Sequence, residues 1–200
     1  MDSAGDISNS VNFTLRTLGR PPRSGNEIKD FIGDGAKVLL ERALGVRDEK
    51  EISEALEIFK PYYLEHCADQ STLYPGVRET LEAFEAIPMG VISNKPQEMI
   101  EKILERFAVS KYFKVVLGPE STREKKPHPE PVLKFLAQAG VPAKDAAVVG
   151  DGITDIQAGK SAGTLTCAVT YGYKERRQLE AQKPDFVIDH LSDLVKIFRP

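Results

Sequence analysis

The stretch AAVVGDGITD, residues 146–155, decides the fold. An apolar run leads into a Gly-Asp-Gly turn, and apolar residues at helical spacing follow over residues 153–162. A short apolar run that is broken by glycine and followed by such a pattern predicts a buried strand joined to a helix. Asp151 then leaves the end of the strand and Asp155 lies on the first helical turn, so both carboxylates can face one point above a sheet.

The same alternation extends through the second part of the chain. Short apolar runs there alternate with helical patterns of about ten residues, which indicates β-α-β units and a parallel sheet covered on both faces. We expect strands over residues 89–92, 114–117, 146–149, 165–169 and 186–188, and helices over 77–86, 97–107, 131–139 and 153–162. The fold class is therefore α/β. In such sheets ligands bind outside the carboxyl ends of the strands, so the polar residues that follow each strand are candidate site residues.

The first part of the chain shows only helical patterns. Helices are expected over residues 7–18, 27–32 and 36–44, with Gly45 ending the third. Asp48 can cap a longer helix that runs through Tyr63. No strand is expected before about residue 73.

Composition excludes several classes of protein. The 200 residues carry 27 Lys+Arg and 30 Asp+Glu, a formal net charge of −3, which disfavours both an acidic disordered protein and a dedicated polyanion binder. The charged cluster over residues 174–177 is short and mixed in sign, so nucleic acid is not an expected partner. Cys67 and Cys167 share no CxxC spacing, which disfavours a zinc site or a disulfide framework. Neither a secretion signal nor a bilayer-length apolar run is present, so we expect a cytoplasmic protein without a membrane partner. Nothing in the sequence indicates an oligomeric state.

Two further strand ends carry polar residues of chemical interest. Ser93 and Asn94 follow the run over 89–92 and precede a helix, so they can bind an anion together with backbone N–H groups, or they can simply cap that helix. Lys126 precedes a proline, which holds its backbone extended and can aim its ammonium into a site; the alternative is a solvated basic loop. His128, between two prolines, is interpreted as a loop residue.

The pair Asp151 and Asp155 supplies hard oxygen ligands, which suit Mg²⁺ together with water and substrate phosphate. The alternative is that Asp151 is the N-cap of the helix and Asp155 stabilises the helix dipole.

The order Ser-Asn, Lys-Pro and Gly-Asp-x-x-x-Asp in a β-α-β chain resembles the haloacid dehalogenase (HAD) superfamily of phosphohydrolases. Within it, several segments look like those of phosphoglycolate phosphatases: FIGDGAKVLLERAL at 31–44, LYPGV at 73–77, KKPHPEP at 125–131 and TYGY at 170–173. The resemblance extends from Asp2 to Leu194. It implies a Rossmann-like core domain over residues 74–200 and an all-helical N-terminal cap domain over residues 3–73.

The resemblance also implies roles for individual residues. Ser93, with Asn94 beside it, would hydrogen-bond the transferring phosphoryl group, and Lys126 would neutralise its charge. Asp151 would bind Mg²⁺ directly, and Asp155 would support the ion through water.

The helical domain would close over the substrate, excluding water and selecting the leaving group. Gly33 and Lys37, in and beside the Gly-Asp-Gly turn at 33–35, would reach the substrate from it.

The family's nucleophile is absent from these residues. It is the first aspartate of an Asp-x-Asp-Gly-Thr stretch at the end of the first strand, and the second aspartate is the general acid and base. That stretch does not occur in the sequence, whose opening MDSAGD matches only the tail of the longer family pattern. We therefore expect the first strand either to lie upstream of Met1 or not to exist. Its loss would leave two unpaired sheet edges, between the strands that end at Ser93 and Asp151.

The predicted function is hydrolysis of a small phosphorylated metabolite, 2-phosphoglycolate above all, through an aspartyl-phosphate intermediate, with Mg²⁺ as cofactor. These residues alone are predicted to have negligible activity. The alternatives are a HAD phosphatase or phosphomutase for another small phosphate ester, and a catalytically dead phosphate-binding or regulatory protein.

Overall fold

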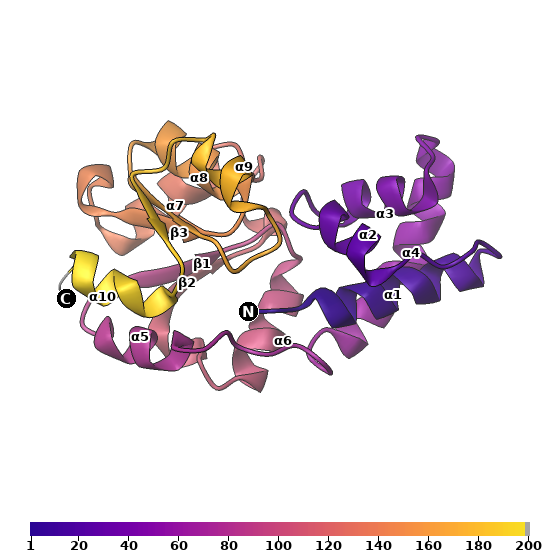
Figure 1. Ribbon diagram of the computed structural model, residues 1–200, viewed down its shortest axis with the longest axis horizontal. Helices are drawn as coiled ribbons and strands as arrows, with labels where there is room; N and C mark the ends of the chain where they lie inside the picture. Colours follow the sequence, from indigo (N-terminus) through magenta and orange to yellow (C-terminus); the bar gives the residue numbers. More distant parts are fainter. Residues whose placement is uncertain (199–200) are drawn as a thin grey trace. The chain divides into compact units, whose positions relative to one another are not determined.

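A computed structural model describes residues 1–198 of the chain, which divides into two compact units. The first spans Met1–Leu73 and the second begins at Tyr74. We call them the helical unit and the α/β unit (Figure 1).

The helical unit contains four α-helices. They are α1 (Ala4–Thr17), α2 (Gly25–Phe31), α3 (Ala36–Leu44) and α4 (Glu49–His66). Helix α1 packs against α4, with Leu15 and Phe59 among the fully buried side chains and the rings of Phe13 and Tyr62 stacked at 3.9 Å. Each such burial contributes roughly 1.5–3 kcal/mol.

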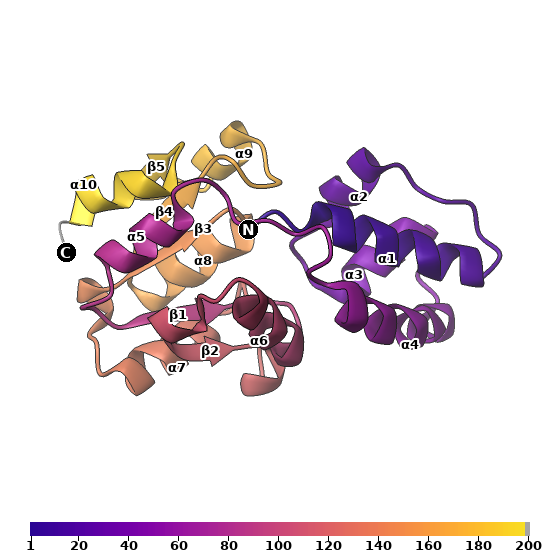
Figure 2. The ribbon, with the colours of Figure 1, turned by 90° about the horizontal axis from the view of Figure 1, so that it is seen from below.

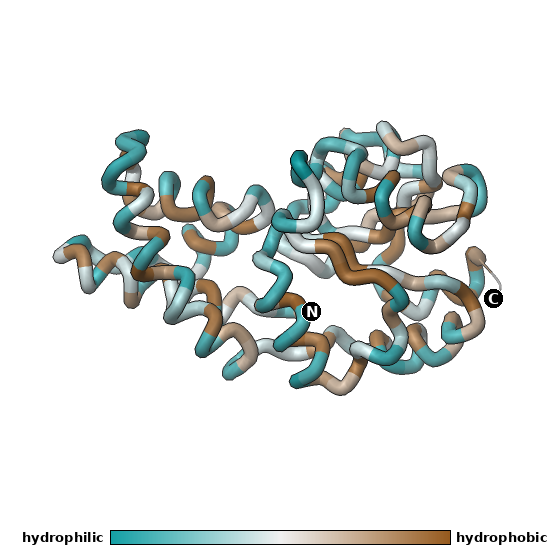
Figure 3. Tube along the Cα trace, turned by 180° about the vertical axis from the view of Figure 1, so that it is seen from behind, coloured by the Kyte–Doolittle hydropathy of each residue, from teal (hydrophilic) through white to brown (hydrophobic). Residues whose placement is uncertain are grey.

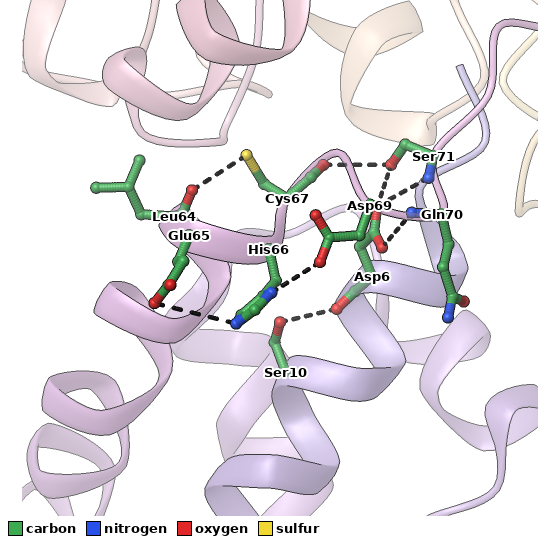
Figure 4. Close-up of polar contacts among 9 residues, drawn as sticks. All are labelled: Asp6, Ser10, Leu64, Glu65, His66, Cys67, Asp69, Gln70 and Ser71. Carbon is green, nitrogen blue, oxygen red and sulfur yellow. Dashed lines mark hydrogen bonds and ion pairs between the residues drawn. The ribbon is translucent and has the colours of Figure 1, made fainter. Parts of the chain in front are cut away.

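The two ends of the helical unit are joined by polar contacts. The backbone of Asp2 exchanges hydrogen bonds with Thr72 (2.8 and 3.0 Å), and this isolated bridge is the only strand-like pairing of the unit. Asp6 is 1% exposed, and its carboxylate accepts from the N–H groups of Gln70 and Ser71 and from the Ser71 hydroxyl at 2.6–2.8 Å (Figure 4). Asp6 therefore fixes the start of α1 to the segment after α4.

The α/β unit alternates helices with parallel strands. Its strands are β1 (Met89–Ile92), β2 (Phe113–Leu117), β3 (Ala147–Gly150), β4 (Leu165–Val169) and β5 (Phe186–Ile188). Its α-helices are α5 (Val77–Ala83), α6 (Gln97–Arg106), α7 (Glu130–Ala139), α8 (Ile153–Ala162), α9 (Arg176–Glu180) and α10 (Leu194–Phe198). Hydrophobic stretches run through the middle of this unit (Figure 3). Its strands pair in parallel, which confirms the α/β class and the predicted parallel pairing.

The strands form two sheets rather than one. β1 pairs with β2, and β3, β4 and β5 pair in that order, whereas within residues 1–198 no ladder joins β1 to β3. Helix α7 packs on β1 and β2, α8 packs on β3 and β4, and the two helices pack on each other (Figure 2). Their shared core contains Val132, Leu136, Ala158 and Ala162. The two helices therefore hold the sheets together on one side, while β3 leaves Val149 38% exposed.

Some predicted boundaries were wrong for local reasons. Helix α2 begins at Gly25 rather than residue 27, because Ser24 and Glu27 form a capping box. Helix α5 ends at Ala83 rather than residue 86, because the chain continues in tighter turns, in which the N–H groups of Glu85 and Ile87 donate to the carbonyls three residues earlier. Among residues 1–198, no helix is long and apolar enough to cross a bilayer.

Candidate functional site

Lys126 links the carboxyl ends of the two sheets. Its ammonium donates to the carbonyl oxygen of Ile92, the last residue of β1, and to Oδ1 of Asp155, which follows β3; both distances are 2.6 Å. The side chains of Lys126 and Asp155 are only 12% and 13% exposed. The alternative of a solvated basic loop is therefore wrong for Lys126.

The loop that carries Lys126 is fixed from two other elements. Asn94 Nδ2 donates to the carbonyl oxygen of Lys126 at 3.0 Å. The carboxylate of Glu130, in the first turn of α7, accepts from the N–H groups of Arg123 (3.2 Å) and Glu124 (3.0 Å), and these bonds lower the pKa of Glu130. Sequence reasoning missed Glu130, because a carboxylate in a first helical turn is common and its target here is a backbone segment six residues earlier.

Ser93 lies one residue beyond the carbonyl that Lys126 binds. Its backbone N–H donates to Leu117 and continues the β1–β2 pairing, while its hydroxyl accepts from the N–H of Lys95 at 3.1 Å. A hydroxyl that accepts in this way still has its own proton to donate to an anion. Helix α6 is preceded by Pro96 as N-cap and has no side-chain cap, so the alternative that Ser93 or Asn94 caps it is wrong.

Both carboxylate oxygens of Asp155 accept hydrogen bonds within the site. Oδ1 accepts from Lys126, and Oδ2 accepts from the N–H of Gly152 at 2.9 Å, which caps α8. Its side chain folds back over the strand end only because Gly150 has no Cβ, since a Cβ there would lie 2.4 Å from the Asp155 Cβ. The N-cap of α8 is Gly152, so the alternative that Asp151 is the N-cap is wrong.

Asp151 is half-buried beside this pair. Burial raises the pKa of its carboxyl above the ordinary value of 3.8, the charge of Asp155 raises it further, and Lys126 opposes both effects. Two carboxylates with a single ammonium leave a net negative charge at the end of β3.

This donor set fits Mg²⁺ through Asp151. Mg²⁺ takes oxygen ligands, keeps several waters and needs few carboxylates from the protein. Each Asp155 oxygen already accepts one hydrogen bond, so these contacts suit support of the ion through water. Within residues 1–198 no group of three or more His, Cys, Asp or Glu side chains forms a self-sufficient metal site.

The remaining sequence candidates lie elsewhere. Gly33 lies between α2 and α3 with φ +128°, and Lys37 in the first turn of α3 forms an exposed ion pair with Glu49 at 2.8 Å. Both belong to the helical unit. His128 is a loop residue, as interpreted from the sequence, and its Nδ1 accepts a hydrogen bond from the N–H of Glu130.

The sequence model of the haloacid dehalogenase-like hydrolase family matches residues 1–169. The chain belongs to this family. That finding confirms the resemblance stated above and the expectation of an enzyme of this kind.

Relatives of the chain carry a common description. It is 39% identical over 199 residues to a phosphoglycolate phosphatase of Aquifex aeolicus, covering 98% of this chain and 91% of the relative. It is 35% identical over 206 residues to a phosphoglycolate phosphatase of Vibrio parahaemolyticus, covering 98% and 90%.

A solved structure shares the fold. The crystal structure described as a predicted phosphoglycolate phosphatase from Haemophilus somnus matches with a TM-score of 0.91 and 35% identity, covering 98% of this chain and 91% of that one.

Proposed function

We propose that this chain is a Mg²⁺-dependent phosphomonoester hydrolase of the HAD family and that its substrate is 2-phosphoglycolate, which yields glycolate and phosphate. One observation carries the proposal: the Lys126 ammonium lies 2.6 Å from both the Ile92 carbonyl and Asp155, so a single cation joins the strand ends that carry Ser93 and Asp151. The relatives described as phosphoglycolate phosphatases support the choice of substrate.

Each residue has a distinct task in this proposal. The Ser93 hydroxyl donates a hydrogen bond to a phosphoryl oxygen, and Lys126 places positive charge against the same group. Phosphoryl transfer depends mainly on positioning and charge stabilisation, which is what these two residues supply. Asn94 holds the backbone of Lys126 in place, and Asp155 orients its ammonium.

Asp151 would hold Mg²⁺ directly, and Asp155 would support it through water. When bound, Mg²⁺ supplies positive charge that binds the phosphoryl oxygens and stabilises the charge of the transition state. Gly33 and Lys37 would contact the substrate from the helical unit, which in this proposal is a cap domain over residues 3–73, with the catalytic core over residues 74–200.

The attacking carboxylate of the family is not among these residues, because the sequence contains no Asp-x-Asp-Gly-Thr stretch. The aspartyl-phosphate step therefore needs an aspartate beyond the 200 residues, and these residues alone are expected to bind phosphate and release almost none from esters. Within residues 1–198 no ladder pairs β1 with β3, which supports the view that a strand belongs between them.

The test compares two forms of the protein. Phosphate release from 2-phosphoglycolate and a panel of other small phosphate esters is measured with the 200-residue chain and with the chain extended before Met1 by an apolar strand ending in Asp-x-Asp-Gly-Thr. We expect activity only in the extended form, with phosphoglycolate preferred and with D151N abolishing it. A flat profile across the panel contradicts the assignment of phosphoglycolate. The DNA upstream of the Met1 codon provides an independent check, because an in-frame strand of this kind would supply the missing aspartates.

The absence of the nucleophile stretch favours one alternative of another class, a phosphate-binding or regulatory protein without turnover. Calorimetry with phosphate and Mg²⁺ separates the two. Saturable binding combined with a stop codon directly upstream of Met1 favours the regulatory protein.

A further inference from the structure

The segment after β4 lies directly against the Asp151 side chain. A Cβ built on Gly172 would lie 2.2 Å from both the Cβ and Oδ2 of Asp151, closer than real atoms approach. Gly172 is not among the glycines with positive φ, so its backbone conformation is open to other residues. The glycine is therefore required by the closeness of Asp151 rather than by the turn.

The segment cannot retreat easily, because the two residues before Gly172 are fixed by contacts of their own. The backbone N–H of Thr170 donates to the Ile188 carbonyl at 3.1 Å, and the Thr170 hydroxyl donates to Asp189 at 2.5 Å. The ring of Tyr171 packs on the core of the α/β unit and lies 4.6 Å from the ring of Tyr74. A clash at Gly172 would therefore displace Asp151 rather than the segment.

We propose that Gly172 is a positioning residue for Asp151, which sets the direction of that carboxylate for its divalent cation. The inference rests on the proposed function, since it takes Asp151 as the ligand of Mg²⁺. Asp155 has a separate support, because Gly150 and Gly152 make room for its side chain. The two carboxylates of the site are thus oriented by different backbone segments, and one can be disturbed while the other keeps its place.

The test is a titration with Mn²⁺, which prefers the same oxygen ligands as Mg²⁺ and is detected by water proton relaxation. Wild type is compared with G172A, D151N and G25A. Gly25 is the matched control, because an added Cβ there meets nothing within 4 Å and the residue lies in α2 of the helical unit. We expect G172A to weaken Mn²⁺ binding about tenfold or more, as supporting residues of metal sites typically do, and G25A to leave it unchanged.

A second measurement distinguishes positioning from a general loss of structure. Phosphate affinity in the absence of metal depends on Ser93 and Lys126, and we expect G172A to retain it within about twofold while metal affinity falls. Equal Mn²⁺ affinity of G172A and wild type overturns the inference. A parallel loss of phosphate and metal affinity also overturns it, because it indicates collapse of the whole site.

T170V provides a variant without a clash. It removes the hydroxyl bond to Asp189 and loosens the segment, so it should also weaken Mn²⁺ binding, but less than G172A does. If G172A does not fold, an unchanged Mn²⁺ affinity of T170V refutes the inference. A wild-type chain that binds no Mn²⁺ refutes the proposed metal site itself, and the inference with it. If wild type binds Mn²⁺ and D151N binds it equally well, the proposed metal site and the inference are refuted in the same way.

Discussion

Replacement of Lys126 by Met should weaken phosphate binding and destabilise the α/β unit at the same time. The ammonium donates to Asp155 at 2.6 Å, and its side chain is 12% exposed, so little solvent screens it. A charge-assisted hydrogen bond is worth about 1.5–3 kcal/mol, which corresponds to a loss of phosphate affinity of roughly 10- to 150-fold.

The stability effect arises from the carboxylate left behind. Removal of one partner from a fully buried ion pair costs about 3–5 kcal/mol, and the residual exposure of this pair places K126M below that range, at about 2–3 kcal/mol. For a protein of this size that corresponds to a fall of about 5–10 °C in the midpoint of thermal unfolding.

The assay is calorimetry with inorganic phosphate in the absence of metal, together with thermal unfolding followed by circular dichroism. K144M is the matched control, because Lys144 is exposed in the turn before β3 and loses the same charge. D155N provides a contrast of opposite sign. It removes a negative charge that competes for Lys126, and Coulomb energies of about 4 kcal/mol at 4 Å in a partly screened site allow phosphate to bind about tenfold more tightly.

Equal phosphate affinity of K126M and K144M would falsify the assignment of Lys126 to the anion site. A loss of affinity in D155N as large as in K126M would show that Asp155 is needed chiefly to orient the lysine.

Three further predictions concern other residues. Burial and then Asp155 raise the pKa of Asp151, so ionisation of this carboxyl destabilises the folded chain at neutral pH. Metal-free D151N should therefore unfold at a higher temperature than wild type, and the difference should shrink as the pH falls through the folded pKa towards 3.8. A difference in unfolding temperature that is independent of pH contradicts this. Burial raises the pKa of Cys167 to about 11, so its thiol should resist alkylation at about pH 8 until the chain unfolds, as peptide mapping by mass spectrometry will show, and rapid labelling of the native chain would refute it. Asp6→Asn sets an amide against the N–H groups that the carboxylate now accepts and should cost about 3 kcal/mol in urea unfolding, whereas D34N at an exposed ion pair should cost less than about 1 kcal/mol.

The sequence predicts the elements whose ends are determined locally. The bounds of α3 and α8 agree with expectation because Gly45 and Gly163 end these helices in the left-handed conformation, which glycine adopts without strain. The five-residue helix α10 was not predicted as a helix, because so few residues show no clear period and depend on tertiary packing.

The site was predictable as a set of residues but not as a set of contacts. Strand ends identified Ser93, Lys126 and Asp151, since parallel strands bring their carboxyl ends to one edge. The bond from Lys126 to the Ile92 carbonyl joins residues 34 positions apart. The close approach of Gly172 to Asp151 brings together the segments that follow two different strands. Such contacts depend on packing, and no local pattern records them.

The pairing of Asp2 with Thr72 places the two ends of the helical unit side by side. Residues 3–71 are therefore a closed segment. Its exchange for the corresponding segment of a relative leaves the distance between its two ends unchanged. Under the function proposed above, such an exchange would alter which molecules are accepted and would leave Ser93, Lys126 and Asp151 in place.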